Sequence, residues 1–238
     1  MSILITGAAH RIGRAMTLKF HAAGHNVLLH CNQSTTAAAS LAEDLNTQRP
    51  DSAHVVTLDL AHLDGLDEFR AQCLQYTGRL DALINNAAAF YPTPLPEVSA
   101  EQFNELININ LRAPYFLTKT FVDYLKGGSV VNIIDIYAEK PLRGFSAYSI
   151  SKAGLAMMTR SLADELGPDI RVNGIAPGAI LWPDATVMDN KTIEGILAGI
   201  PAGRLGDPND IANAALFLVD QADYVSGQII SVAGGSSV

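Results

Sequence analysis

Short apolar runs alternate along the chain with longer segments in which apolar residues recur at helical spacing. Several runs are apolar almost continuously, which is typical of strands that helices cover on both faces of a parallel sheet. The predicted strands are residues 3–6, 27–30, 54–58, 82–85, 130–135, 171–175 and 228–232. The predicted helices are residues 12–23, 35–47, 64–77, 100–126, 147–166 and 208–220. This order predicts right-handed βαβ crossovers and a single α/β domain over residues 1–238, built on a doubly wound, seven-stranded parallel sheet with helices on both faces.

Two segments break the regular spacing of these elements. Residues 90–96 read Phe-Tyr-Pro-Thr-Pro-Leu-Pro, and the fixed φ of each proline predicts a stiff, extended loop. Residues 179–207 form a much longer connection, and connections of that length are usually functional. We expect residues 179–207 to act as a substrate loop, in the manner of a lid.

Composition and charge narrow the class of partner. The chain has 16 Lys and Arg against 24 Asp and Glu, and the net charge of -8 argues against a nucleic-acid surface, which needs a basic face. No stretch approaches the roughly 18 uncharged apolar residues of a membrane span. Cys31 and Cys73 are too few for a disulfide framework, and the N-terminus lacks the features of a signal peptide. We therefore expect a cytoplasmic protein that contacts neither nucleic acid nor membrane.

A glycine-containing loop follows the first predicted strand and precedes a helix. It reads Thr-Gly-Ala-Ala-His-Arg-Ile-Gly-Arg over residues 6–14. Small residues let the backbone approach a pyrophosphate, and the helix N-terminus offers free N–H groups, as in Rossmann domains. The loop therefore predicts a dinucleotide site at Gly7, Arg11, Ile12 and Gly13, although a plain strand-to-helix turn would read the same. Arg11 adds a positive charge that could face cofactor phosphate or substrate.

The end of the second predicted strand carries neutral polar residues. His30, Asn32, Gln33 and Ser34 lie there, and the sequence holds no Asp or Glu between Asn26 and Glu43. An NAD-selective pocket usually places an acid at this point to bind the ribose 2′-hydroxyl, and that acid would repel a 2′-phosphate. Its absence favours NADP(H), with His30, Asn32 and Ser34 as cofactor contacts.

Tyr148 and Lys152 have the i, i+4 spacing that places two side chains on one face of a helix. A lysine ammonium near a phenol stabilises the phenolate, which suits a tyrosine to acid–base chemistry. Tyr115 and Lys119 share the spacing, but Tyr115 lies in the middle of a predicted helix beside Phe116 and Leu117 and is interpreted as a core residue. Asp135 ends the fifth predicted strand, at the sheet edge where ligands of such folds bind. It could hydrogen-bond Tyr148 and a polar substrate, or it could be a solvated carboxylate at a strand end.

Two further features have a functional and a plain interpretation. Phe90, in the stiff loop, could stack on a flat ring or could be a core aromatic residue. His21 and His25 have helical spacing, but Gly24 lies between them and no glutamate accompanies them, so we expect no metal site.

Together these motifs resemble the short-chain dehydrogenase/reductase family, from Ile3 to Gly235. The resemblance implies that Asn110, Tyr148 and Lys152 form the catalytic set. It also implies that Asp59 caps the adenine and that Pro177-Gly178 holds the nicotinamide. The cofactor site implied in this way comprises Gly7, Arg11, Ile12, Gly13, His30, Asn32, Ser34, Asp59, Leu60, Asn86, Ala87, Ala88, Tyr148, Lys152, Pro177, Gly178 and Ile180.

Within that family the chain looks most like the pteridine reductases. Arg11 stands in the middle of the glycine loop, Asp135 replaces the usual catalytic serine, and Phe90 follows the Asn-Asn-Ala motif. The resemblance implies a pterin site at Arg11, Phe90, Asp135, Tyr148 and Trp182. The chain departs from those reductases at three places: Ala88 replaces a common serine of the pterin site, Gln33 replaces a common arginine near the 2′-phosphate, and residues 232–235 lack a common aspartate.

The predicted function is NADPH-dependent reduction of a 7,8-dihydropterin to its tetrahydro form. With no clear cationic cluster in residues 179–207, a neutral side chain of the monapterin or biopterin type is favoured over folate. A carbonyl reductase of the same fold, acting on a 3-oxoacyl thioester or a sugar ketone, is the first alternative, and a non-catalytic NADP-binding regulator is the second. The resemblance also implies a homotetramer.

Overall fold

A computed structural model describes residues 1–180 and 190–237. All seven predicted strands are present and pair in parallel in one sheet of order β3-β2-β1-β4-β5-β6-β7. The strands are β1 (Ser2–Ile5), β2 (Asn26–Cys31), β3 (Ala53–Thr57), β4 (Ala82–Asn85), β5 (Ser129–Ile133), β6 (Arg171–Pro177) and β7 (Ile229–Val232). The prediction of a single doubly wound domain is confirmed.

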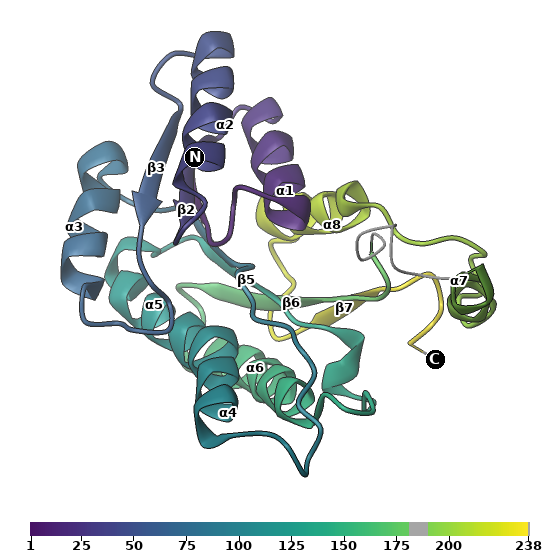
Figure 1. Cartoon of the computed structure of the whole chain (residues 1–238). Helices are drawn as coiled ribbons and strands as arrows, with labels where there is room; N and C mark the ends of the chain where they lie inside the picture. The colour runs from purple at the N-terminus through teal and green to yellow at the C-terminus, as the bar shows by residue number, and fades with distance from the viewer. Residues whose placement is uncertain (181–189, 238) are drawn as a thin grey trace.

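Helices cover both faces of the sheet (Figure 1). One face carries α1 (Arg11–Ala22), α2 (Thr35–Gln48) and α8 (Pro208–Asp220), whose apolar residues pack with those of the strands around Phe20, Leu29 and Ile211. The other carries α3 (Leu66–Thr77), α5 (Ala113–Phe121) and α6 (Ser146–Glu165), packed around Phe69, Phe121 and Leu155. These two cores explain the continuous apolar runs, because the central strands bury both of their faces. Among the described residues, no helix is long and apolar enough to cross a membrane.

The predicted helix at residues 100–126 is wrong in one respect, because the structure divides it. It comprises α4 (Ala100–Ile107), a π-helical segment (Asn108–Arg112), α5 and a 3-10 turn (Val122–Tyr124). Pro114 lies at the start of α5. It has no N–H to donate to the carbonyl of Asn110, and its ring would crowd that carbonyl in a regular helix. The widened turn therefore follows from Pro114, and π-helical turns are frequent at functional sites.

Two other boundaries differ from the prediction. The long connection at residues 179–207 contains a helix, α7 (Asn190–Ala198), which the sequence analysis missed because glycines and prolines surround this short segment. Strand β5 ends at Ile133, so Asp135 lies two residues beyond it, at the start of a 3-10 turn (Ile136–Ala138). Asp135 Oδ1 accepts a hydrogen bond from the N–H of Tyr137 at 2.9 Å, which caps this turn.

The strand order places the ends of β1 and β4 side by side at the centre of the sheet. The order in which strands are added reverses at this point. From β1 the chain continues to β2 on one side of the sheet, whereas from β4 it continues to β5 on the other side. Ligands of open α/β sheets bind at such a switch point, beyond the carboxyl ends of the strands. The loops after β1, β4 and β5 meet there.

Candidate active site

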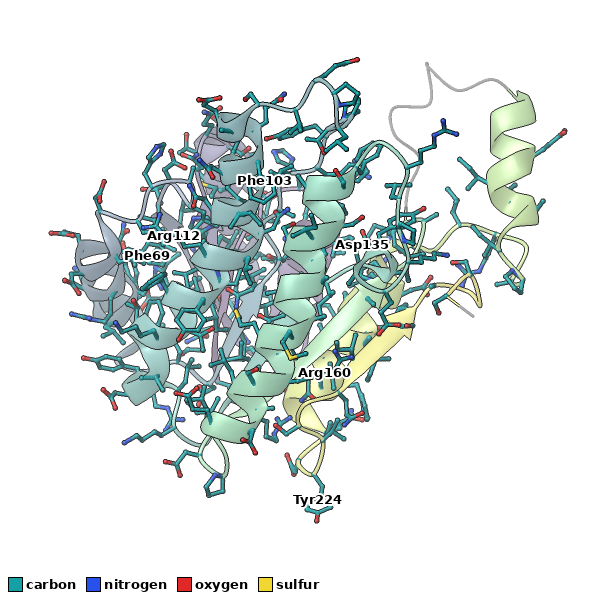
Figure 2. All side chains as sticks on the ribbon, turned by 90° about the horizontal axis from the view of Figure 1, so that it is seen from below. Phe69, Phe103, Arg112, Asp135, Arg160 and Tyr224 are labelled. Atoms are coloured by element: carbon teal, nitrogen blue, oxygen red, sulfur yellow. The ribbon has the colours of Figure 1, made fainter. Side chains whose placement is uncertain are left out.

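Tyr148, Asp135 and Lys152 form a connected group at the carboxyl edge of the sheet. The hydroxyl of Tyr148 donates a hydrogen bond to Asp135 Oδ2 at 2.7 Å. Lys152 lies one turn further along α6; its Nζ donates to the carbonyl of Ile133 at 2.9 Å and lies 5.8 Å from the centre of the Tyr148 ring. Figure 2 shows Asp135 beside α6, with Arg160 further along the same helix. The contact anticipated between Asp135 and Tyr148 is thus present.

Burial sets the protonation of this group. It raises the pKa of Tyr148, and the carboxylate of Asp135 raises it further. Burial also raises the pKa of Asp135, against hydrogen bonds from Tyr137 and Tyr148. For Lys152 burial acts the other way and lowers the pKa to about 8, opposed by the charge of Asp135. At neutral pH Tyr148 therefore keeps its proton, as a general acid must.

Asn110 lies in the π-helical segment and is fully buried. Its Oδ1 accepts from the N–H of Ala89 at 2.8 Å, and its Nδ2 donates to the carbonyl of Ala89 and to Ser151 Oγ, both at 3.0 Å. Ser151 Oγ in turn donates to the carbonyl of Tyr148 at 2.7 Å. Asn110 therefore links the loop after β4 to the helix that carries Tyr148. Sequence reasoning missed Ser151.

The loop after β1 has the shape that its sequence predicts. Gly7 and Arg11 have φ of +64° and +47°, in the left-handed region that glycine adopts freely. A Cβ atom on Gly13 would lie 2.0 Å from the carbonyl oxygen of Gly7, so only glycine fits there. Ile12 is partly buried and packs against the core, while Arg11 is exposed.

The first turn of α1 is free to bind an anion. Among the described residues, no side chain caps its N-terminus at His10, and no acid lies in its first turn. Uncapped N–H groups and the helix dipole favour a phosphate at this position. The residues present therefore fit the pyrophosphate of a dinucleotide.

The side chains after β2 divide into a buried and an exposed set. His30 is 2% exposed and its ring pairs with the main chain of Gly7 and Leu58, whereas Asn32 and Gln33 are exposed. Ser34 precedes α2 and makes no capping hydrogen bond with its side chain. Contact of His30, Asn32 and Ser34 with a cofactor stays a prediction.

The Asn-Asn-Ala motif joins the ends of β1 and β4. Asn86 Nδ2 donates to the carbonyls of Thr6 and Gly7, at 2.8 and 3.2 Å. Thr6 Oγ1 accepts from the N–H groups of Asn86 and Ala87 at 2.8 and 2.9 Å. Ala88 follows at the sheet edge. Sequence reasoning did not assign Thr6 a role, yet its hydroxyl fixes the path of this motif.

The other residues of the predicted cofactor site lie on loops at the same edge. Asp59 closes its own turn by accepting from the N–H of Ala61 at 2.9 Å, and the neighbouring Leu60 is buried. Gly178, directly after β6, leaves no room for a Cβ, which would lie 2.8 Å from Ala233. Ile180 is buried and pairs with Gly206. Trp182, predicted as a substrate contact, lies outside the described residues.

Phe90 lies beside Tyr148 and is largely exposed. The residue is 56% exposed; its ring stacks on that of Phe145 with centres 4.8 Å apart at 14°, and meets the ring of Tyr148 edge-on with centres 4.7 Å apart. The N–H of Thr93 donates to the carbonyl of Gly144 at 2.6 Å, which holds the stiff loop against the loop before α6. Phe90 is therefore an aromatic surface of the site rather than a core residue. Phe145 was missed by sequence reasoning.

The loop is also held to α4. The hydroxyl of Tyr91 donates to Glu105 Oε2 at 2.8 Å and to the carbonyl of Gln102 at 3.0 Å. Burial raises the pKa of Tyr91 to about 12, so this donor keeps its proton at neutral pH. Phe90 thus faces the site, whereas the next residue, Tyr91, faces α4.

Comparison with known proteins places the chain in a family. The family model described as "Enoyl-(Acyl carrier protein) reductase" matches residues 7–237. The chain belongs to the short-chain dehydrogenase/reductase family. It is 35% identical to the 3-oxoacyl-[acyl-carrier-protein] reductase FabG of Thermotoga maritima, covering 98% of this chain and 96% of that one.

Two other relatives have different names. Pteridine reductase 1 of Leishmania tarentolae is 33% identical, covering 99% of this chain and 96% of that one. The 2-dehydro-3-deoxy-D-gluconate 5-dehydrogenase of Formosa agariphila is 31% identical, covering 98% and 90%. Membership of the short-chain reductases therefore makes this chain an NAD(P)-dependent oxidoreductase, but its relatives do not agree on a substrate.

His21 and His25, the helically spaced pair, serve structural roles. His21 Nε2 pairs with Ser52 Oγ at 2.8 Å, and His25 Nε2 pairs with Asp220 Oδ2 at 2.9 Å. The two rings thus have separate partners on different elements. In the described part of the chain no three His, Cys, Asp or Glu side chains gather as metal ligands would.

Proposed function

We propose that this short-chain reductase reduces a 7,8-dihydropterin to its tetrahydro form with NADPH. The observation that carries the proposal is the hydrogen bond of Tyr148 to Asp135 at 2.7 Å, directly beside the exposed ring of Phe90. A carboxylate and an aromatic face in one site suit a substrate that is flat and rich in N–H donors.

Asp135 distinguishes the pterin proposal from carbonyl reduction. A carbonyl substrate needs a neutral hydroxyl that donates to its oxygen, whereas a pterin offers amino and ring N–H groups that a carboxylate can accept. Asp135 is held by the N–H of Tyr137 and the hydroxyl of Tyr148, so its position is fixed before substrate binds. Carboxylate oxygens accept more than one hydrogen bond each, which leaves capacity for the substrate.

Phe90 supplies the surface on which a pterin ring would stack. Offset stacking of two aromatic rings contributes about 0.5–1.5 kcal/mol beyond the buried area. The contacts of Phe145, Tyr91 and Thr93 hold the Phe90 loop in place. Little conformational freedom remains to be lost on binding, which favours affinity for a flat substrate.

The chain's own residues would handle the proton. When bound, NADPH supplies the hydride that reduces ring carbon C6, while the proton reaches N5 from water or from the site. Tyr148 is the donor for positions within its reach, assisted by Asp135. Lys152 binds the nicotinamide ribose and tunes Tyr148, and the Asn110–Ser151 hydrogen bonds support a water-linked path for the proton.

The loop after β2 and the N-terminus of α2 support NADPH rather than NADH as the cofactor. Asn32, Gln33 and Ser34 bring neutral side chains to the position where NAD-selective sites carry an acid. The N-terminus of α2 lacks a side-chain cap from Ser34 and has no acid in its first turn among the described residues. A ribose 2′-phosphate would meet these free N–H groups.

A 3-oxoacyl thioester is the second candidate substrate, because several relatives at 30–35% identity are named as 3-oxoacyl-[acyl-carrier-protein] reductases. Against it stands Asp135 in place of a hydroxyl donor. The second alternative, a non-catalytic NADP-binding regulator, is disfavoured, because such a protein would not need the assembled Tyr148–Lys152 pair.

The finer features of the proposal follow the resemblance to pteridine reductases. We propose a homotetramer, with a substrate loop at residues 179–207 and a pterin that carries a neutral side chain. The test is NADPH oxidation with dihydromonapterin, dihydrobiopterin, dihydrofolate and acetoacetyl thioester in parallel. Turnover of the dihydropterins supports the proposal, whereas turnover of the thioester alone overturns it.

A further inference from the structure

His30 lies at the end of β2, and both nitrogens of its ring pair with main-chain groups of other elements. The N–H of Gly7 donates to Nδ1 at 3.3 Å, and Nε2 pairs with the carbonyl of Leu58 at 3.0 Å. Because Gly7 offers a donor and Leu58 an acceptor, the ring must carry its proton on Nε2. One side chain thus connects the loops that follow β1 and β3.

The His30 side chain is buried and uncharged. The ring is 2% exposed and packs edge-on against Phe69, with ring centres 5.6 Å apart. Burial lowers the pKa of His30 to about 4, so the ring is neutral at physiological pH. The main chain of His30 takes part as well, because its carbonyl accepts from the N–H of Ala8 at 3.0 Å.

Gly7 is the residue whose position determines the rest of the loop. Its φ of +64° turns the chain after β1, and its carbonyl oxygen lies so close to Gly13 that a Cβ there would clash at 2.0 Å. A shift of Gly7 would therefore displace Gly13 and the first turn of α1. The N–H of Gly7 is occupied by His30, so the N–H groups left for an anion are those further along, at the start of α1.

We propose that His30 is a positioning residue for the dinucleotide: it fixes the Gly7 turn, and through it the helix N-terminus that binds the pyrophosphate, without contacting the cofactor. This role differs from the direct cofactor contact that the sequence analysis predicted for His30. The inference rests on the dinucleotide-binding part of the proposed function and is independent of the pterin.

The test distinguishes the two ring nitrogens of His30 by replacing the ring with an amide side chain that substitutes for one nitrogen at a time. In His30→Asn the amide oxygen takes the place of Nδ1 and keeps the acceptor for Gly7, while the bond to Leu58 is lost. In His30→Gln the amide nitrogen takes the place of Nε2 and keeps the bond to Leu58, while Gly7 is left unpaired. Each variant loses one buried hydrogen bond, so both should lower the melting temperature by similar amounts.

Calorimetric titration of each variant with NADPH and with NADH gives the dissociation constants. We expect the dissociation constant for the preferred cofactor to rise about tenfold in His30→Gln, the effect of one unpaired buried N–H, and to stay within about threefold of wild type in His30→Asn. His21→Phe is the matched control, because it removes a buried histidine hydrogen bond at the far end of α1. It should lower the melting temperature and leave the dissociation constant unchanged.

Two results would overturn the proposal. One is an unchanged dissociation constant in His30→Gln, which would show that the Gly7 bond does not affect cofactor binding. The other is an equal rise in His30→Asn and His30→Gln, which would show that His30 acts only through general stability or through direct contact. A wild-type protein that binds NADPH but reduces no pterin would refute the proposed substrate and leave this test intact.

Discussion

Replacing Lys152 by methionine should stabilise the ligand-free protein while removing most of its activity. Lys152 is 2% exposed and donates one hydrogen bond among the described residues, to Ile133. Burial lowers its pKa from the ordinary 10.5 to about 8. Each pKa unit corresponds to about 1.4 kcal/mol, so carrying the charged ammonium at pH 7 costs the folded state about 3 kcal/mol.

Methionine has a similar length and no charge to bury. Loss of the hydrogen bond to Ile133 offsets about 1 kcal/mol of the gain, so Lys152→Met should be more stable than wild type by about 2 kcal/mol at pH 7. The advantage should shrink with pH. Between pH 8 and 10.5 the unfolded chain still holds a proton that folded Lys152 has released, so wild-type stability rises with pH across this window.

Urea unfolding at pH 7 and at pH 10 measures both effects. Lys119→Met is the matched control, because Lys119 is exposed on α5 and its replacement should change stability by less than about 0.5 kcal/mol. Two results would refute the cost assigned to the buried ammonium of Lys152. One is a Lys152→Met protein that is no more stable than wild type at pH 7, and the other is a stability difference that does not change with pH.

Four further predictions concern single side chains. Tyr148→Phe should lower kcat about 10²- to 10⁴-fold in steady-state assays, because the general acid is lost; full activity would remove Tyr148 from that role. Asp135→Ser should lower kcat/KM for dihydropterin by at least about tenfold, and retained activity would refute its assigned contact. Phe90→Ala should raise KM for dihydropterin about 2- to 13-fold and leave KM for NADPH unchanged, whereas an unchanged pterin KM would place Phe90 outside the site. The pKa of His30 is about 4 in the folded protein against an ordinary 6.5, so the unfolded chain takes up a proton first as the pH falls. Between pH 6.5 and pH 4 the unfolding free energy of wild type should therefore fall by about 3 kcal/mol relative to that of His30→Phe. Urea unfolding measures both free energies, and a difference that does not change with pH would contradict this.

The sheet and most helices could be predicted because their signals are local. Continuous apolar runs mark strands buried on both faces, and the sequence separation of 13 between Asp135 and Tyr148 leaves room for one turn before the helix. The spacing of Tyr148 and Lys152 was likewise enough to place both on one face of α6. Pro114 was a local signal too, and attention to it would have predicted the break in the helix at residues 100–126.

What could not be predicted depends on contacts between distant segments. The hydrogen bonds of His30 require that β1, β2 and the loop after β3 adopt a particular register, which no spacing within the sequence specifies. The stacking of Phe145 on Phe90 brings together loops 55 residues apart whose paths are set by prolines, glycine and the bond from Thr93. Sequence reasoning named Phe90 as a candidate but had no means of finding the residue that holds it.

The proposed dihydropterin substrate is tested most directly by the ratio of two specificity constants. NADPH oxidation by the wild-type protein gives kcat/KM for 7,8-dihydromonapterin and for acetoacetyl thioester under the same conditions. We predict that the dihydropterin is the better substrate and that Asp135→Ser reduces or reverses the preference. A wild-type enzyme that prefers the thioester, with Asp135→Ser leaving the ratio unchanged, would contradict it.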